Sequence, residues 1–183
     1  MPTTYLFTSQ RLGFRAWRDS DMPLMTEISA DPLVMEFFPS VADASQTAGF
    51  IKRMQKMQMD RGYCYFAVDV LEGNKFIGFI GLCFQDYESP VTPSVDIGWR
   101  LSPSAWGMGY ATEGAQRCIA YGFETLGLAK IIAVAPQLNI KSINVMKKAG
   151  MQLACTFEHP KLLDTPRLTT CVCYEIVKTK EAE

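Results

Sequence analysis

Short runs in which apolar residues alternate with polar ones, or follow one another without a break, predict β-strands along the chain. In the first run, Leu12, Phe14 and Ala16 are expected to share one face. The turn residues Glu72-Gly73-Asn74 join two later runs, which predicts a hairpin, and a third run extends it into an antiparallel meander. The predicted strands cover residues 11–17, 63–71, 75–83, 95–101, 130–135, 152–157 and 170–177.

Between these runs, apolar residues recur at helical spacing and predict four helices. The first begins at Asp19-Ser20-Asp21, which offers N-cap side chains, and ends near Asp31-Pro32. Glycines at 127 and 150 stop the third and fourth helices. The second helix starts at Asp43 or Ser45 and runs to about residue 60, and the fourth covers residues 140–149. The order of elements predicts one mixed α/β domain over residues 1–183.

Composition narrows the class of protein. Of the 183 residues, 48% are hydrophobic and 20% are charged, which is typical of a globular domain that buries a core. The net charge of -1 gives no reason to expect a nucleic-acid partner or an anionic membrane. No apolar stretch approaches the roughly 20 residues needed to span a bilayer, and the first residues lack the pattern of a secretory signal. We therefore expect a cytoplasmic protein.

The cysteines and the histidine limit the possible chemistry. Six cysteines are spread through apolar stretches without a Cys-x-x-Cys motif, so we expect reduced, mostly buried thiols. His159 is the only histidine, which excludes a site with several histidine ligands, and no metal is expected.

Two glycines one residue apart, Gly107 and Gly109, follow a predicted strand and precede a predicted helix. The first amides of a helix have no partner within it, and glycines let a backbone wrap closely around a phosphate. The segment lacks the Gly-Lys-Ser/Thr of a P-loop and the Gly-x-Gly-x-x-Gly of a dinucleotide fold. From these residues alone, a plain turn and an anion-binding loop both remain open.

The surrounding sequence resembles a known family. The stretch VDIGWRLSPSAWGMGYATEG, residues 95–114, is similar to the acetyl-CoA-binding core of the GNAT N-acetyltransferases. Three further blocks, SQRLGFR at 9–15, DPLVMEFFP at 31–39 and NIKSINVMKKAGM at 139–151, resemble the branch that includes the ribosomal-protein alanine acetyltransferases. The resemblance spans nearly the whole chain, in order. It implies a GNAT-like fold: a mixed, mostly antiparallel central sheet flanked by helices.

The resemblance also implies how acetyl-CoA would bind as co-substrate. The loop and helix start at residues 106–112 would hold the pyrophosphate through backbone amides, and the strand end would pair with the pantetheine arm. Asn139 would reach the pantetheine amides, and Ser142 would lie near the thioester. Lys141, Lys147 and Lys148 are expected to be solubilising surface residues. The implied cofactor-binding residues are Trp99, Arg100, Leu101, Trp106, Gly107, Met108, Gly109, Tyr110, Ala111, Thr112, Asn139 and Ser142.

Three positions depart from the family pattern. Ser104 stands where relatives carry glutamine or arginine near the phosphates, and Met151 replaces a phenylalanine. Met146 stands where many relatives have a tyrosine that acts as the acid. Because a thioether gives no proton, the general acid is unassigned.

The implied reaction is direct attack of a primary amine on the acetyl carbonyl, which requires a neutral amine. Asp96 is the candidate base, since it aligns with a glutamate that serves as base in several relatives, and a water would relay the proton. Its alternative role is that of an ordinary solvent-facing strand residue. Ser142 is the candidate hydrogen-bond donor to the leaving thiolate, or a polar residue in the first turn of a helix. Glu113 is expected to be structural. For His159 we expect an ordinary surface or loop position, and a place at the border of the acceptor site, together with Glu158, is the alternative.

The acceptor stays open between a small-molecule amine and a protein N-terminus. An acidic groove would favour polyamines or aminoglycosides, and an open, shallow groove would favour a peptide terminus. The alternative to an enzyme is a CoA-binding regulatory module of the same fold, to which Met146 gives some weight. The oligomeric state, monomer or homodimer, is also open.

Overall fold

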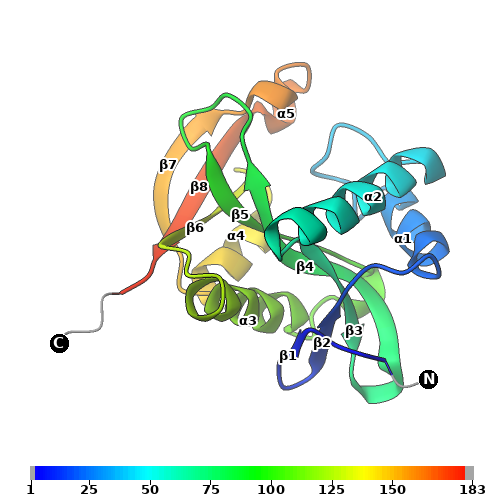
Figure 1. Cartoon of the computed structure of the whole chain (residues 1–183). Helices are drawn as coiled ribbons and strands as arrows, with labels where there is room; N and C mark the ends of the chain where they lie inside the picture. Colours follow the sequence, from blue (N-terminus) through cyan, green and yellow to red (C-terminus); the bar gives the residue numbers. More distant parts are fainter. Residues whose placement is uncertain (1–2, 180–183) are drawn as a thin grey trace.

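A computed structural model describes residues 3–179 of the chain (Figure 1). Eight strands form one sheet in the order β1-β2-β3-β4-β5-β6-β8-β7. The strands are β1 (Phe7–Thr8), β2 (Leu12–Arg15), β3 (Tyr65–Val70), β4 (Lys75–Gln85), β5 (Ser94–Leu101), β6 (Lys130–Pro136), β7 (Gln152–Glu158) and β8 (Thr170–Val177). The helices are α1 (Asp21–Ala30), α2 (Ala44–Arg61), α3 (Tyr110–Glu124), α4 (Ile140–Lys148) and α5 (Pro166–Thr169).

The strands pair antiparallel except at the centre of the sheet. The predicted meander is confirmed, because β3 pairs with β4 and β4 with β5 over nearly their whole lengths. β5 and β6 run parallel and share a single aligned pair, Asp96 with Ile132. Past that pair the two strands separate, so one edge of the second half of β5 has no neighbouring strand.

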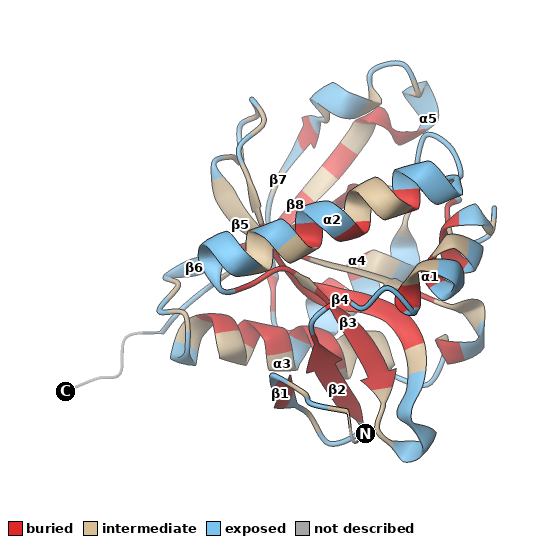
Figure 2. Ribbon diagram, turned by 45° about the vertical axis from the view of Figure 1, so that its right-hand side comes forward, coloured by how far each residue is buried: buried red, intermediate tan, exposed pale blue. Residues whose placement is uncertain are grey.

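Helices cover both faces of the sheet. α1 and α2 lie on one face and α3 and α4 on the other (Figure 1). α2 turns Ile51 and Met54 into the core and leaves its outer side exposed, and strands β2 to β4 are buried between the layers (Figure 2). A capping box fixes the start of α2: the side chains of Asp43 and Gln46 each accept a hydrogen bond from the other's backbone N–H.

One charged network lies inside the α1 side of the core. Arg15 donates to both oxygens of Asp21 and both oxygens of Asp69 at 2.7–2.8 Å, and all three side chains are buried. Burial alone would lower the pKa of Arg15, but the hydrogen bonds and charges of the two carboxylates outweigh it and raise the pKa, so the buried charges are compensated.

Several details differ from the sequence predictions. Ala16 is exposed, because the chain leaves the sheet after Arg15 and Trp17 instead packs into the core. β1 and α5 were not predicted, since two and four residues carry too little periodicity to be recognised. The cysteines of the described residues are free as expected, and five of the six are buried.

Over residues 3–179 no helix is long and apolar enough to cross a membrane. The same residues contain no group of three or more histidine, cysteine or acidic side chains placed to hold a metal ion.

Candidate functional site

The separation of β5 from β6 opens a cavity of about 890 Å³ in the middle of the molecule. One wall is the free edge of β5 from Ile97 to Leu101, and the opposite wall is the end of β6 with the start of α4. Trp106 Nε1 donates to the carbonyl of Leu101 at 2.9 Å, so this carbonyl faces away from β4. Because a strand alternates the direction of its peptide groups, the N–H and C=O of Trp99 face the cavity as well. The cavity therefore has a backbone edge to which an extended ligand can add as a strand.

The glycine loop closes one end of this cavity. Gly107 and Gly109 have φ of 74° and 80°, the left-handed region in which a side chain is strained. The first backbone bond of α3 runs from Glu113 N–H to Gly109 C=O, which leaves the amides of Tyr110, Ala111 and Thr112 without a partner in the helix. These three residues line the cavity, so free amides and the positive end of the helix dipole meet there.

Arg11 holds the loop from outside. Its Nη1 donates to the carbonyl of Met108 at 3.0 Å, and its Nε pairs with Glu113 at 2.7 Å. Glu113 also accepts hydrogen bonds from Ser9 Oγ and from the backbone N–H of Arg11, which confirms its structural role. These contacts lower the pKa of Glu113, although burial alone would raise it. The loop is thus fixed before any ligand binds.

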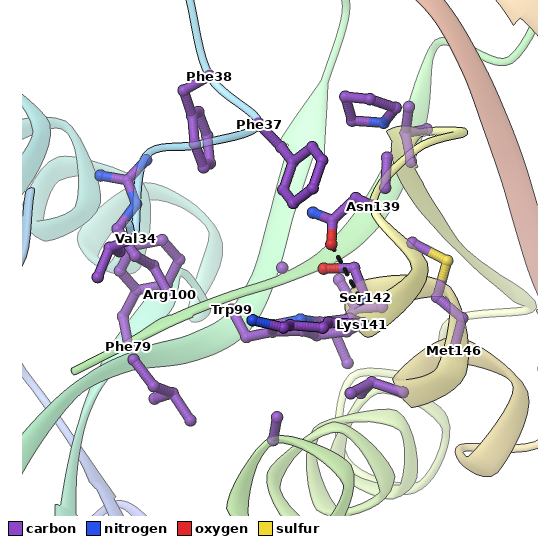
Figure 3. Close-up of a pocket in the computed structure, with 18 of the residues that line it drawn as sticks. Val34, Phe37, Phe38, Phe79, Trp99, Arg100, Asn139, Lys141, Ser142 and Met146 are labelled. Atoms are coloured by element: carbon purple, nitrogen blue, oxygen red, sulfur yellow. Dashed lines mark hydrogen bonds between the residues drawn. The ribbon is translucent and has the colours of Figure 1, made fainter. Parts of the chain in front are cut away.

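The start of α4 forms the facing wall. Asn139 is the N-cap, and its Oδ1 accepts from the N–H of Ser142 at 3.1 Å (Figure 3). This bond leaves the amide nitrogen of Asn139 as a donor. Lys141 lies with its ammonium 4.7 Å from the ring centre of Trp106, across the cavity mouth. Met146 is 2% exposed and contributes only apolar surface to the wall.

Asp96 lies where β5 and β6 meet, and it faces the cavity rather than bulk solvent. Its Oδ1 accepts from Tyr65 Oη at 2.7 Å and from Gln85 Nε2 at 3.3 Å. Burial raises the pKa of Asp96 from 3.8 to about 6, while the two hydrogen bonds and the charge of Lys161 act in the opposite direction. A carboxylate in this state is ionised at neutral pH and can accept a proton.

Aromatic side chains cover the cavity on the side of α1 and α2. Phe37 and Phe38 belong to the loop between these helices and line the cavity, and Phe38 lies over Arg100 (Figure 3). Phe50 of α2 and Tyr65 of β3 pack against Phe79 of β4, with ring centres 5.0 and 5.1 Å apart. This wall was not predicted, because it is assembled from four successive segments whose spacing along the chain does not show that their aromatic rings meet at one cavity.

A second group of side chains borders the opposite rim. His159 lies with its ring centre 5.0 Å from that of Tyr87, and Lys161 lies over the same tyrosine ring. Burial lowers the pKa of His159, and its Nδ1 accepts from the N–H of Lys161. His159 lines the cavity, whereas Glu158 does not and instead accepts a hydrogen bond from the hydroxyl of Thr170.

Twelve of the thirteen residues named from the sequence line this one cavity. Met108 is the exception, since its side chain is 55% exposed and only its carbonyl, bound to Arg11, takes part in the loop. Arg100 lines the cavity with its side chain, on the face opposite to Trp99.

Residues 11–152 match the family described as "Acetyltransferase (GNAT) domain". The uncharacterized N-acetyltransferase YoaA of Bacillus subtilis is 33% identical over 180 residues, which cover 96% of this chain and 98% of the relative. The chain therefore belongs to the GNAT family and is an N-acetyltransferase.

Two solved structures show the same fold at low identity. The spermidine N-acetyltransferase of Vibrio cholerae, in complex with CoA and spermine, is 19% identical, with a TM-score of 0.72 over 91% of this chain and 95% of that one. A RimL ribosomal α-N-protein acetyltransferase in complex with coenzyme A is 17% identical, with a TM-score of 0.75 over 95% and 98%.

Proposed function

We propose that this enzyme transfers an acetyl group from acetyl-CoA to a primary amine by direct attack within a ternary complex. The observation that carries the proposal is the continuous path along the cavity from Asp96, past the free edge of β5, to the unpartnered amides of α3. The path matches a ligand with a reactive end, an extended amide-containing arm and a pyrophosphate. The two distant structures with bound CoA support this assignment.

Each wall of the cavity supplies one type of contact for the co-substrate. The backbone of Trp99 pairs with the pantetheine arm, and the amide nitrogen of Asn139 donates to it from the other side. The amides of Tyr110, Ala111 and Thr112 hold the pyrophosphate, with the left-handed glycines keeping the loop close to it. Lys141 adds positive charge at the cavity mouth.

Asp96 acts as the base. The amine nitrogen forms the new bond to the acetyl carbon as its proton passes to Asp96, directly or through one water, and the bond from carbon to sulfur breaks. Tyr65 and Gln85 hold the carboxylate in position. Ser142 donates a hydrogen bond to the departing thiolate, which then takes a proton from solvent, so no acid of the tyrosine type is required at Met146.

The shape and charge of the cavity bear on the acceptor. Its lining within the described residues contains two carboxylates, Asp96 and Glu36, against the cations Arg100, Lys141, Lys148 and Lys161. A polycation such as spermidine binds where acidic groups outnumber basic ones. The balance here favours an acceptor with a single amine, either a small molecule or a peptide terminus.

The test is a screen of small amines and peptides with free N-termini, followed by detection of the free thiol released from acetyl-CoA. We expect release that depends on the acceptor, with omission of the acceptor as the control. Binding of acetyl-CoA without release for any acceptor would contradict the proposal and support a CoA-binding regulatory module.

A further inference from the structure

A smaller cavity of about 240 Å³ adjoins the main one between α1, α2, the loop that joins them and β5. Phe38, Phe50 and Arg100 line both cavities, so the two share a wall beneath the aromatic cover. The smaller cavity also contains the polar side chains of Ser29, Thr47 and Arg53. No acidic side chain of the described residues lines it.

Two buried side-chain polar atoms within residues 3–179 have no hydrogen-bond partner, Thr47 Oγ1 and Arg100 Nε. Both residues line the smaller cavity. Arg100 makes one hydrogen bond, from Nη1 to Ser29 Oγ at 3.2 Å, and forms no ion pair in the described chain. Orphaned buried polar groups cost stability, so two of them around one cavity indicate a missing partner.

The contrast with Arg15 shows how unusual this state is. Arg15 is fully buried on the α1 side of the sheet, whereas Arg100 is partly exposed with a buried Nε, and two carboxylates surround Arg15. Apart from its hydrogen bond to Ser29, Arg100 meets the rings of Phe38 and Phe79, which lie 4.4 and 5.5 Å from its guanidinium carbon. Aromatic faces offset part of the desolvation of a cation, but they leave its N–H donors free. Burial accordingly lowers the pKa of Arg100 to about 10.

We propose that the smaller cavity is an anion subsite for the acceptor, and that the acceptor is an amine carrying a carboxylate. Arg100 and Arg53 supply the positive charge, while Thr47 and Ser29 supply hydroxyl donors. A planar guanidinium fork with free N–H groups suits a carboxylate. The inference rests on the proposed function, because it places the amine at Asp96 in the main cavity.

The spacing along β5 sets the distance between the two ends of the acceptor. Asp96 and Arg100 lie four residues apart on the same face, which separates their Cα atoms by about 13 Å. The amine and the carboxylate of an α-amino acid are too close together to reach both sites. An acceptor with an apolar body of several bonds spans them, and the rings of Phe38, Phe50 and Phe79 line the space between.

The test compares acceptors that differ only at the end remote from the amine. Aminobutanoate, aminohexanoate and aminooctanoate are each assayed beside the alkylamine and the diamine of the same length. For at least one length we expect kcat/KM for the carboxylate to exceed that of the alkylamine by about tenfold or more, and the diamine to be the poorest. Equal values for carboxylate and alkylamine at every length, or a preference for the diamines, would overturn the inference.

Three variants locate the effect. Arg100→Met and Arg53→Met should each lower kcat/KM for the carboxylate acceptor by about tenfold more than they lower kcat/KM for the alkylamine. Thr47→Val keeps the shape and removes the orphaned hydroxyl. We expect it to lower use of the carboxylate acceptor while the protein becomes no less stable. Lys52→Met, next to Arg53 on the exposed side of α2, is the matched control and should change neither acceptor.

The outcomes separate the two proposals. Turnover of alkylamines without a carboxylate preference rejects the anion subsite alone, whereas failure of every amine to release thiol rejects acetyl transfer as well. If Arg100→Met does not fold, two tests of the anion subsite remain. These are the comparison of acceptors on the wild-type enzyme and the assays of the Thr47→Val and Arg53→Met variants. Loss of both acceptors in parallel in those two variants would mean a structural role and would also reject the subsite.

Discussion

In the Asp96→Asn variant, the carboxylate beside Tyr65 and Gln85 becomes a neutral amide of the same shape. The amide oxygen still accepts from Tyr65, so the hydrogen-bonded frame around position 96 is kept. The substitution removes the negative charge of the carboxylate, and an amide cannot act as the base. We expect activity to fall by about a hundredfold or more, while the fold becomes more stable at neutral pH.

The size of the gain follows from the pKa. Burial raises the pKa of Asp96 from 3.8 to about 6 in the folded protein. Between these values the native state binds more protons than the unfolded chain, so stability falls as pH rises and the loss is complete above pH 6. A difference of this size corresponds to about 3 kcal/mol, which the variant recovers at about pH 8 and hardly at all at about pH 4.

Two assays check this prediction. Denaturant unfolding at both pH values should show the gain only at the higher one, and Asp19→Asn, at an exposed carboxylate, should show none at either. The wild-type plot of log kcat/KM against pH should steepen below an apparent pKa of about 6, and the variant should lack this change of slope. A gain in stability that is equal at both pH values, or absent at pH 8, would refute the desolvation argument.

Three other predictions concern the loop, the helix start and the core. Gly107→Val should weaken CoA binding by about tenfold, measured by calorimetry. The control is Gly73→Val, at a left-handed position in the β3–β4 turn. It should cost about 1–2 kcal/mol of stability and leave CoA affinity unchanged. Ser142→Ala should reduce kcat severalfold with little effect on the stability of α4, since the cap bond uses the backbone of Ser142; an unchanged kcat and CoA affinity would remove Ser142 from the site. Arg15→Met should destabilise the protein by about 3–5 kcal/mol in denaturant unfolding, because Asp21 and Asp69 lose their cation, and a loss below about 1 kcal/mol would contradict the network.

Local chemistry predicted most of the elements. Asp43 starts α2 with a side-chain cap, and Gly127 and Gly150 follow α3 and α4 with positive φ, as their positions in the sequence indicate. Pairing between distant strands could not be predicted in the same way. Cys173 is aligned with Val134 of β6 on one side and Cys155 of β7 on the other, because β8 inserts between two strands that precede it. Nothing local to Cys173 encodes that order.

The candidate site also contains residues that the local sequence predicts and residues whose role only the tertiary structure shows. The closely spaced Gly107 and Gly109 are visible in the sequence, and in the structure both have positive φ and line the cavity. The role of Arg100 is different, because the resemblance assigned it to the co-substrate through its backbone. Its side chain turns to the other face of the sheet, where its neighbours come from α1 and from the loop before α2. Only tertiary packing shows that this guanidinium has no anionic partner among residues 3–179.

The single aligned pair between β5 and β6 also has a consequence for unfolding. The strands form two half-sheets, β1 to β5 and β6 to β8, whose junction has one aligned strand pair, Asp96 with Ile132, and α3 packs beneath it. We expect each half to open locally with its own free energy when no ligand is bound, and the amides along the free edge of β5 to exchange their hydrogens rapidly. An extended arm seated on Trp99 adds backbone hydrogen bonds at that junction. We therefore expect such binding to make unfolding more cooperative and the protein more stable, with the ligand acting as part of the sheet.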